Sequence, residues 1–230
     1  MKKKNAKTIL VALGTLVAFA LWTFLIRCVD VQPIGPNGSR VGFAAINGAF
    51  HALTGVHWAL YTLTDWLGLV PIGIALGFAV LGLVQLIRRK SLLKVDRDIL
   101  ILGGFYNVVL AAYLLFETVV INFRPVLIDG KLEASYPSST TMLALCILPT
   151  AMMQLKTRIR SDAVRCAILG ILAAFTVFMV VGRLISGVHW LTDIIGGVLL
   201  SVGLVMLYAF ATKRQGKSRD NSPCTVKCLR

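Results

Sequence analysis

Apolar residues in this chain occur in long runs, separated by short segments that carry most of the charged side chains. Six runs reach or approach the roughly 20 residues that a helix needs to cross a bilayer core of about 30 Å: 8–26, 66–87, 99–121, 139–155, 163–185 and 190–212. Backbone polar groups in hydrocarbon must be hydrogen bonded internally, so each run is predicted to be a helix. The fourth run contains Pro149 and is expected to be kinked, with neighbouring helices satisfying the freed carbonyl group.

The connection between the first two runs, 28–65, is the longest one predicted. It opens with turn-forming residues at 32–38 and continues at 41–63 with mixed apolar and small residues, including His51 and His57. This composition is typical of a helix on the membrane surface, with aromatic side chains at headgroup depth. The histidines could instead bind a metal, but their spacing does not place them on one helix face. The predicted fold is therefore an all-α integral membrane protein, a bundle of six transmembrane helices with an outer-side interfacial helix.

Glycines recur along the second run, and their spacing is typical of a face that packs closely against another helix. They are Gly68, Gly73, Gly77 and Gly82.

The distribution of charge predicts the orientation of the bundle. The chain has 24 Lys and Arg against 10 Asp and Glu, a balance that could also suggest a nucleic-acid partner. Most of the basic residues fall on the side that holds both termini, as the positive-inside rule requires of cytoplasmic loops. We therefore expect cytoplasmic termini, no nucleic-acid partner, one membrane domain at 1–212 and a basic, disordered cytoplasmic tail at 213–230.

The N-terminal run and the cysteines each allow a second interpretation. A lysine-rich start before an apolar run also describes a signal peptide, but the run is long and lacks a small-residue cleavage site, which favours an uncleaved first span. Of the five cysteines, Cys224 and Cys228 could form half of a metal site. With no second pair and no nearby histidine, no metal site is predicted.

Polar residues gather in three segments at the predicted outer ends of the helices: Asn-Phe-Arg-Pro at 122–125, Tyr-Pro-Ser-Ser-Thr-Thr at 136–141, and the segment 182–193. His189 and Asp193 are four residues apart and share a helix face. A carboxylate can orient an imidazole and leave its other nitrogen free to attack. Arg124 and Arg183 supply planar cations that suit phosphoryl oxygens. The set therefore predicts a phosphate site with a histidine nucleophile.

The second segment adds a possible anion cradle to this set. Ser138 and Ser139 stand at the N-terminus of the fourth predicted helix, where free backbone N–H groups bind anions.

The Arg-Pro pair, the Pro-Ser-Ser-Thr stretch and the Arg-x5-His-x3-Asp spacing resemble the three motifs of the type-2 phosphatidic acid phosphatase family, which shares a catalytic core with vanadium-dependent haloperoxidases. The resemblance runs from Glu117 to Asp193. It implies that His189 forms a phosphohistidine, that Asp193 orients it, and that Arg124, Ser138 and Arg183 bind the phosphate.

Three positions depart from the family's motifs. Glu117 stands where the family has a lysine, Thr140 replaces the histidine that protonates the leaving group, and Gly182 replaces a serine. Glu117 could pair with Arg124 or a neighbour, and Lys131 could replace the missing cation. Because a diphosphate needs less help from a general acid than an alkoxide leaving group does, a lipid diphosphate such as a polyprenyl diphosphate is the preferred substrate.

The expected function is hydrolysis of a lipid phosphate or diphosphate at the outer face of the cell membrane. No cofactor or metal is expected, because the arginines take the role that Mg²⁺ would otherwise have. A phosphotransferase that uses the same phosphohistidine and a non-catalytic lipid-phosphate binder or transport component remain alternatives. The sequence leaves the oligomeric state open.

Overall fold

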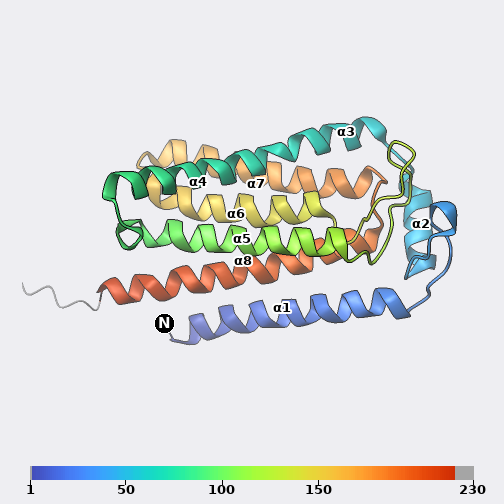
Figure 1. Ribbon diagram of the computed structural model, residues 1–230, viewed down its shortest axis with the longest axis horizontal. Helices are drawn as coiled ribbons and strands as arrows, with labels where there is room; N and C mark the ends of the chain where they lie inside the picture. Colours follow the sequence, from blue (N-terminus) through green and yellow to red (C-terminus); the bar gives the residue numbers. More distant parts are fainter. Residues whose placement is uncertain (1, 221–230) are drawn as a thin grey trace, which may run out of the picture.

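The computed structural model describes residues 2–220, which form helices joined by loops. Long helices lie side by side along the molecule, and the short helix α2 lies at one end of them (Figure 1). This all-α membrane architecture confirms the predicted fold class. The elements in chain order are α1 (Lys2–Cys28), η1 (Pro36–Gly38), α2 (Ala44–Thr54), α3 (Trp58–Leu67), α4 (Leu69–Arg89), η2 (Leu92–Lys94), α5 (Arg97–Thr118), α6 (Ser139–Arg158), α7 (Asp162–Ile185) and α8 (Leu191–Asp220).

Both ends of the described chain lie at the end of the bundle opposite α2 (Figure 1). The chain runs the length of the bundle in α1, in α3 and α4 together, and in α5, α6, α7 and α8, so it returns to the end where it began. We call the end where α2 lies the α2 end. Basic residues occupy the helix ends far from α2, among them Arg88, Arg89, Arg97, Lys156 and Arg158. The charge asymmetry seen in the sequence therefore corresponds to the two ends of the folded bundle.

The predicted bounds of the interfacial helix, 41–63, are wrong. The helix α2 ends at Thr54 because Gly55 has φ 65° and ψ −159°, a conformation that glycine adopts without steric strain. The chain then enters α3, which continues through Gly68 into α4 as one 32-residue apolar span, Trp58–Arg89. Asp65 interrupts the apolar pattern, so the sequence placed the start of this span too late.

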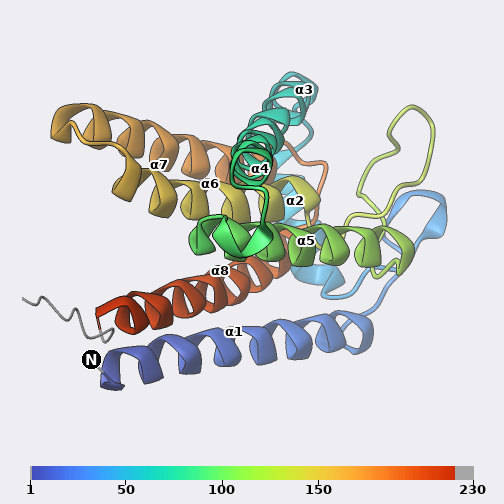
Figure 2. The same ribbon diagram turned by 60° about the vertical axis from the view of Figure 1, so that its left-hand side comes forward.

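The central helix of the bundle is α6, which lies among α4, α5, α7 and α8 (Figure 2). Five helices of the described chain are long and apolar enough to cross a membrane, and α6 is not one of them. Its neighbours shield it from lipid, so it can carry polar side chains provided that they find partners. Gln154 of α6 donates a hydrogen bond of 2.6 Å to the hydroxyl group of Tyr208 in α8.

Glycines allow close helix packing in α8, and in the second span two of the four predicted glycines lie at such contacts. A Cβ atom on Gly203 would lie 2.7 Å from the side chain of Leu16 in α1. By contrast, Gly73 and Gly77 of α4 have no described atom within 4 Å of such a Cβ. Among the predicted four, Gly82 does approach Ile99 of α5, and Gly68 approaches Thr140 of α6.

The last helix runs past the predicted end of the final span at residue 212 and reaches Asp220. Residues 213–220 are therefore helical, where the sequence suggested a disordered tail. Cys224 and Cys228 lie outside the described residues.

Candidate functional site

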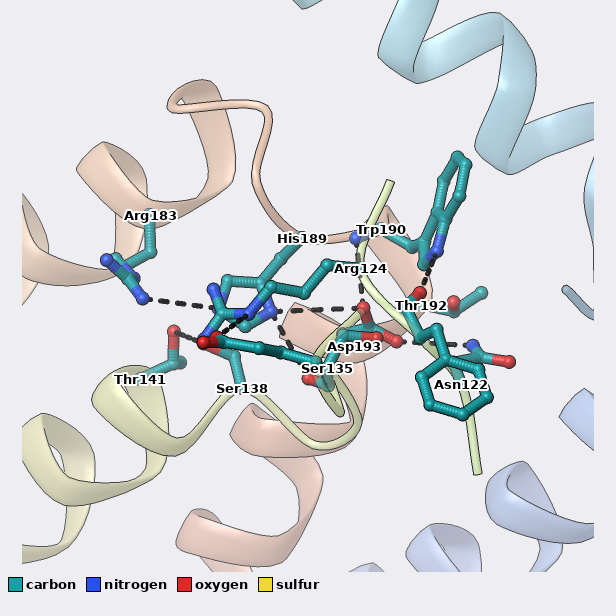
Figure 3. Close-up of polar contacts among 12 residues, drawn as sticks. Asn122, Arg124, Ser135, Ser138, Thr141, Arg183, His189, Trp190, Thr192 and Asp193 are labelled. Carbon is teal, nitrogen blue, oxygen red and sulfur yellow. Dashed lines mark hydrogen bonds and ion pairs between the residues drawn. The ribbon is translucent and has the colours of Figure 1, made fainter. Parts of the chain in front are cut away.

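The three polar segments meet at the α2 end of the bundle (Figure 3). The Nε2 atom of His189 lies 3.4 Å from a terminal nitrogen of Arg124 and 3.3 Å from a terminal nitrogen of Arg183. All three side chains are buried. The structure thus brings two guanidinium groups, from segments far apart in sequence, onto one imidazole nitrogen.

The hydrogen bonds of His189 define which nitrogen carries the proton. Its Nδ1 atom lies 3.2 Å from the backbone oxygen of Ser135, and a carbonyl oxygen can only accept, so Nδ1–H is the donor. Nε2 therefore holds the lone pair and faces the two guanidinium groups. Burial, together with the charges of Arg124 and Arg183, holds the pKa of His189 well below its usual value. The imidazole is neutral, and its free lone pair faces the cations.

Asp193 lies behind the imidazole and is held by other donors. One carboxylate oxygen accepts a bond of 3.2 Å from the amide of Asn122, and the other accepts a bond of 2.9 Å from the backbone N–H of Trp190. The Trp190 bond satisfies an N–H group at the start of α8, as a capping residue does. Asp193 lies 3.9 Å from Nδ1 of His189. The sequence predicted that Asp193 orients the imidazole, whereas the Ser135 carbonyl is the closer hydrogen-bond acceptor and Asp193 supplies a nearby carboxylate.

Arg183 ends α7 and contacts one turn of α3. Its side chain is 1% exposed, and one terminal nitrogen lies 3.5 Å from the hydroxyl of Thr64 and 3.5 Å from the carboxylate of Asp65. Its guanidinium carbon lies 5.0 Å from the ring centroid of Tyr61, a cation–π contact. Its Nε atom has no hydrogen-bond partner among the described residues. Sequence reasoning missed these three α3 residues; a lone carboxylate within an apolar run was the available signal.

The helix α3 can approach Arg183 this closely because the preceding residue is Gly182. A Cβ atom at that position would lie 2.8 Å from the methyl carbon of Thr64 and 3.7 Å from Leu60. The glycine that departs from the motif is therefore explained by the packing of α3 against α7.

Arg124 is held by the loop between α5 and α6. Its Nε atom lies 3.1 Å from a carboxylate oxygen of Glu133, and its backbone N–H donates to the Glu133 carbonyl at 3.0 Å. The indole N–H of Trp190 bonds to the carbonyl of Phe123 at 2.7 Å. The loop therefore places Arg124 against the start of α8.

Ser138 is the residue that precedes α6, and it is completely buried. Its backbone N–H donates to the carbonyl of Asp193 at 3.2 Å, and its hydroxyl bonds to that of Thr141 at 3.0 Å. Ser139 and Thr140 follow at the start of α6 and line a groove described below. The second segment thus joins the site through the backbone of Ser138.

Two of the expected variant residues lie apart from the arginine cluster. Glu117 is exposed in the last turn of α5 and lines a small cleft with Ser135 and His189. The carboxylate that pairs with Arg124 is Glu133, not Glu117. Lys131 is exposed in a turn, where its backbone pairs with Ile128.

The helix α2 holds the turn that carries His189. Asn47 bonds through both atoms of its amide to Thr192, at 3.0 Å to the hydroxyl and 3.2 Å from the backbone N–H. His51 lies 3.1 Å from the carbonyl of Gly187. Gly187 has φ 71°, and a Cβ there would lie 1.8 Å from the carbonyl oxygen of Gly55. The turn is therefore fixed from outside the bundle, and His51 has a structural contact.

A large apolar groove of about 1110 Å³ begins beside the site. Its walls are α3 and α4 on one side and α5 on the other, and α6 forms its floor. At the α2 end it is lined by Asp65, Tyr113, Ser139 and Thr140; at the far end it reaches Leu86, Leu92 and Val95.

Comparisons with known proteins identify the family and the fold. A family model described as the PAP2 superfamily matches residues 99–217, which include all three polar segments. The crystal structure of a transmembrane PAP2-type phosphatidylglycerolphosphate phosphatase from Bacillus subtilis is similar, with a TM-score of 0.54 and 19% sequence identity over 95% of this chain and 98% of that one. At this identity the similarity concerns the fold. A search of curated proteins found no match.

Proposed function

The chain belongs to the PAP2 superfamily, and on that premise we propose that it is a membrane lipid phosphatase that works through a phosphohistidine at His189. One observation carries the proposal: a neutral imidazole nitrogen with a free lone pair lies 3.3 and 3.4 Å from two buried guanidinium groups. Guanidinium groups bind phosphoryl oxygens in a planar fork. A phosphoryl group held by Arg124 and Arg183 is thereby presented to Nε2.

In the first step Nε2 forms a bond to phosphorus, and the bond from phosphorus to the leaving oxygen breaks. The two guanidinium groups stabilise the charge on the equatorial oxygens of the transition state. The imidazole becomes cationic because Nδ1 keeps its proton. The carbonyl of Ser135 accepts that proton in a hydrogen bond, and the Asp193 carboxylate, 3.9 Å away, stabilises the positive charge. Water then attacks phosphorus and releases the imidazole.

The groove supports a lipid as the substrate. It opens beside Ser139 and Thr140 and is lined mostly by apolar side chains of α4 and α5. Along α4 it extends from Leu69 to Leu86, about 26 Å at the rise of an α-helix. One leaflet has only about 15 Å of hydrocarbon depth. The groove therefore suits a chain that reaches beyond the bilayer midplane, as a polyprenyl chain can.

The residue at 140 supports a diphosphate headgroup. Thr140 cannot protonate a leaving alkoxide, and a positioned general acid contributes about 10²–10⁴-fold to such reactions. A lipid phosphate leaves from a diphosphate as a stable anion without this help. We infer a preference for polyprenyl diphosphates over lipid phosphomonoesters.

The distribution of basic residues supports a site on the non-cytoplasmic side. Arg88, Arg89, Arg97 and Arg158 lie at helix ends opposite the site, and basic residues are retained in the cytoplasm. Both chain termini are then cytoplasmic.

The test is phosphate release by purified protein from a polyprenyl diphosphate, a phosphatidate and a phosphatidylglycerol phosphate, with and without a chelator. We expect the diphosphate to be hydrolysed fastest and the chelator to have no effect. His189→Ala should lower turnover by at least about 10³-fold, since loss of a covalent nucleophile costs about 10⁶-fold in a serine hydrolase. Radiolabelled phosphohistidine should form in the wild type and be absent from the variant. A His189→Ala protein with normal turnover contradicts the mechanism.

Product analysis separates hydrolysis from transfer. Inorganic phosphate as the sole phosphorylated product besides the lipid supports a hydrolase. A new phosphorylated acceptor would instead indicate a phosphotransferase.

A further inference from the structure

The carboxylate of Asp65 is a charged group of the site that no motif includes. It contacts Arg183 at 3.5 Å, yet its side chain is 57% exposed, and it lines the α2 end of the apolar groove with Ser139 and Thr140. A charged side chain within a membrane helix is costly and marks a functional site by default. Asp65 therefore requires an explanation beyond the packing of α3.

Arg183 lies between Asp65 and the nucleophile. One terminal nitrogen of the guanidinium group contacts Asp65 at 3.5 Å, and the other contacts Nε2 of His189 at 3.3 Å. A phosphoryl group bound to this guanidinium has the imidazole on one side and the groove, with Asp65, on the other. In-line attack on a phosphohistidine comes from the side opposite the imidazole, which is the side from which the lipid leaves.

Asp65 lines the same groove as Thr140, which stands at the position of the family's acid. A Cβ atom on Gly68, one turn after Asp65, would lie 3.4 Å from the methyl group of Thr140. The turn of α3 that carries Asp65 therefore packs against the start of α6, where Thr140 lacks an ionisable group. Asp65 is the carboxylate that the groove offers at this place.

Resting on the proposed function, we infer that Asp65 is the general base for hydrolysis of the phosphohistidine. A water molecule in the vacated leaving-group position loses one proton to the Asp65 carboxylate as its oxygen bonds to phosphorus. The bond between phosphorus and Nε2 breaks, its electron pair returns to Nε2, and inorganic phosphate leaves. The protonated carboxyl group then releases its proton to solvent, which its exposure allows. The guanidinium of Arg183 offsets the repulsion between carboxylate and phosphoryl oxygens.

The chain supplies a matched control. Glu133 pairs with the other arginine, Arg124, at 3.1 Å, and its side chain is 42% exposed. If Asp65 served only to hold an arginine, Asp65→Asn and Glu133→Gln would have the same kind of effect.

The experiment measures steady-state phosphate release and the fraction of enzyme trapped as radiolabelled phosphohistidine, with a polyprenyl diphosphate as substrate. Asp65→Asn should lower turnover by about 10²-fold, the lower range for a general base, while the trapped fraction rises several-fold. Asp65→Glu should restore part of the turnover. Glu133→Gln should change KM and leave the trapped fraction at the wild-type level.

Three outcomes overturn the role of Asp65 while leaving the phosphohistidine intact. Asp65→Asn could show wild-type turnover and trapping, it could lose turnover without accumulating label, or it could behave like Glu133→Gln. If His189→Ala still forms labelled protein, the proposed function fails and the role of Asp65 fails with it.

Discussion

At the scale of single residues, the site depends on the electronic state of one imidazole. A histidine that acts as a nucleophile must keep a lone pair free, and here burial and two neighbouring cations favour the neutral imidazole. The carbonyl of Ser135 binds Nδ1–H, and the arginines disfavour a second proton on Nε2. The arginines that we propose bind phosphate therefore also keep the imidazole of His189 unprotonated.

This arrangement predicts an unusual pH response of His189. Its pKa lies well below the usual value of 6.5 because of burial and the neighbouring cations. A histidine with a lowered pKa stays neutral as the pH falls through the ordinary range, so the imidazole should not gain a proton between about pH 7.5 and 5.5. Nitrogen NMR of the labelled imidazole, assigned with His189→Ala, should show an Nδ1–H tautomer that is constant over this range. A titration centred near pH 6.5 is the contrary result.

At the scale of helices, α3 lies close enough to α7 to contribute side chains to the site. Gly182 leaves room for Thr64, and Thr64 and Asp65 then contact Arg183. The family's serine at this position is incompatible with the observed spacing, because its Cβ would lie 2.8 Å from Thr64. This closeness connects a departure in one motif to residues outside all motifs.

Substitution of that glycine tests the packing. Gly182→Ser should push α3 outward, weaken the contacts of Arg183 and destabilise the protein by about 1–3 kcal/mol, the usual cost of overpacking. Thermal unfolding in detergent measures the loss of stability, and the KM for substrate should rise. The double variant Gly182→Ser with Thr64→Ala removes the obstructing methyl group, so stability should be partly restored. No recovery in the double variant means that the contact with Thr64 is not the cause.

At the scale of the whole molecule, the groove joins the site to the far end of the bundle. It separates α4 from α5 along most of their length, while α6 closes it from behind. Lateral openness of this kind suits a substrate that arrives from the bilayer with its chain still in hydrocarbon. The depth of the groove then sets which chains it can hold.

Filling the groove should discriminate between chain lengths. Gly103 lines it ten residues before Tyr113 along α5, about 15 Å from the site end. Gly103→Phe should lower kcat/KM for a long polyprenyl diphosphate by about tenfold or more, as steric changes in apolar pockets do, and leave geranyl diphosphate unaffected. Gly170→Phe is the control, because Gly170 is also open to 4 Å but lies on α7 outside the groove. Equal effects on long and short chains would exclude a chain-length role.

The sequence by itself determined the membrane bundle, the alternation of passes and the segments that carry Arg124, Arg183 and His189. Runs of apolar residues and the position of basic ones act locally along the chain, so they can be interpreted without knowing which helices touch. The start of α3 was misplaced because Asp65 interrupts an apolar run, and only the fold shows that this carboxylate faces Arg183.

The tertiary structure alone decided the partners within the site. The Ser135 carbonyl rather than Asp193 accepts the hydrogen bond from Nδ1 of His189, and α6 is central despite its polar residues, because of contacts between segments distant in sequence. Glu133 rather than Glu117 pairs with Arg124 because the loop between α5 and α6 folds back on itself. The Ser135 oxygen lies 3.2 Å from Nδ1 and the nearer Asp193 oxygen 3.9 Å, and this difference decides which of them accepts the hydrogen bond. Such distances are set by how the helices pack, and no pattern along one helix contains them.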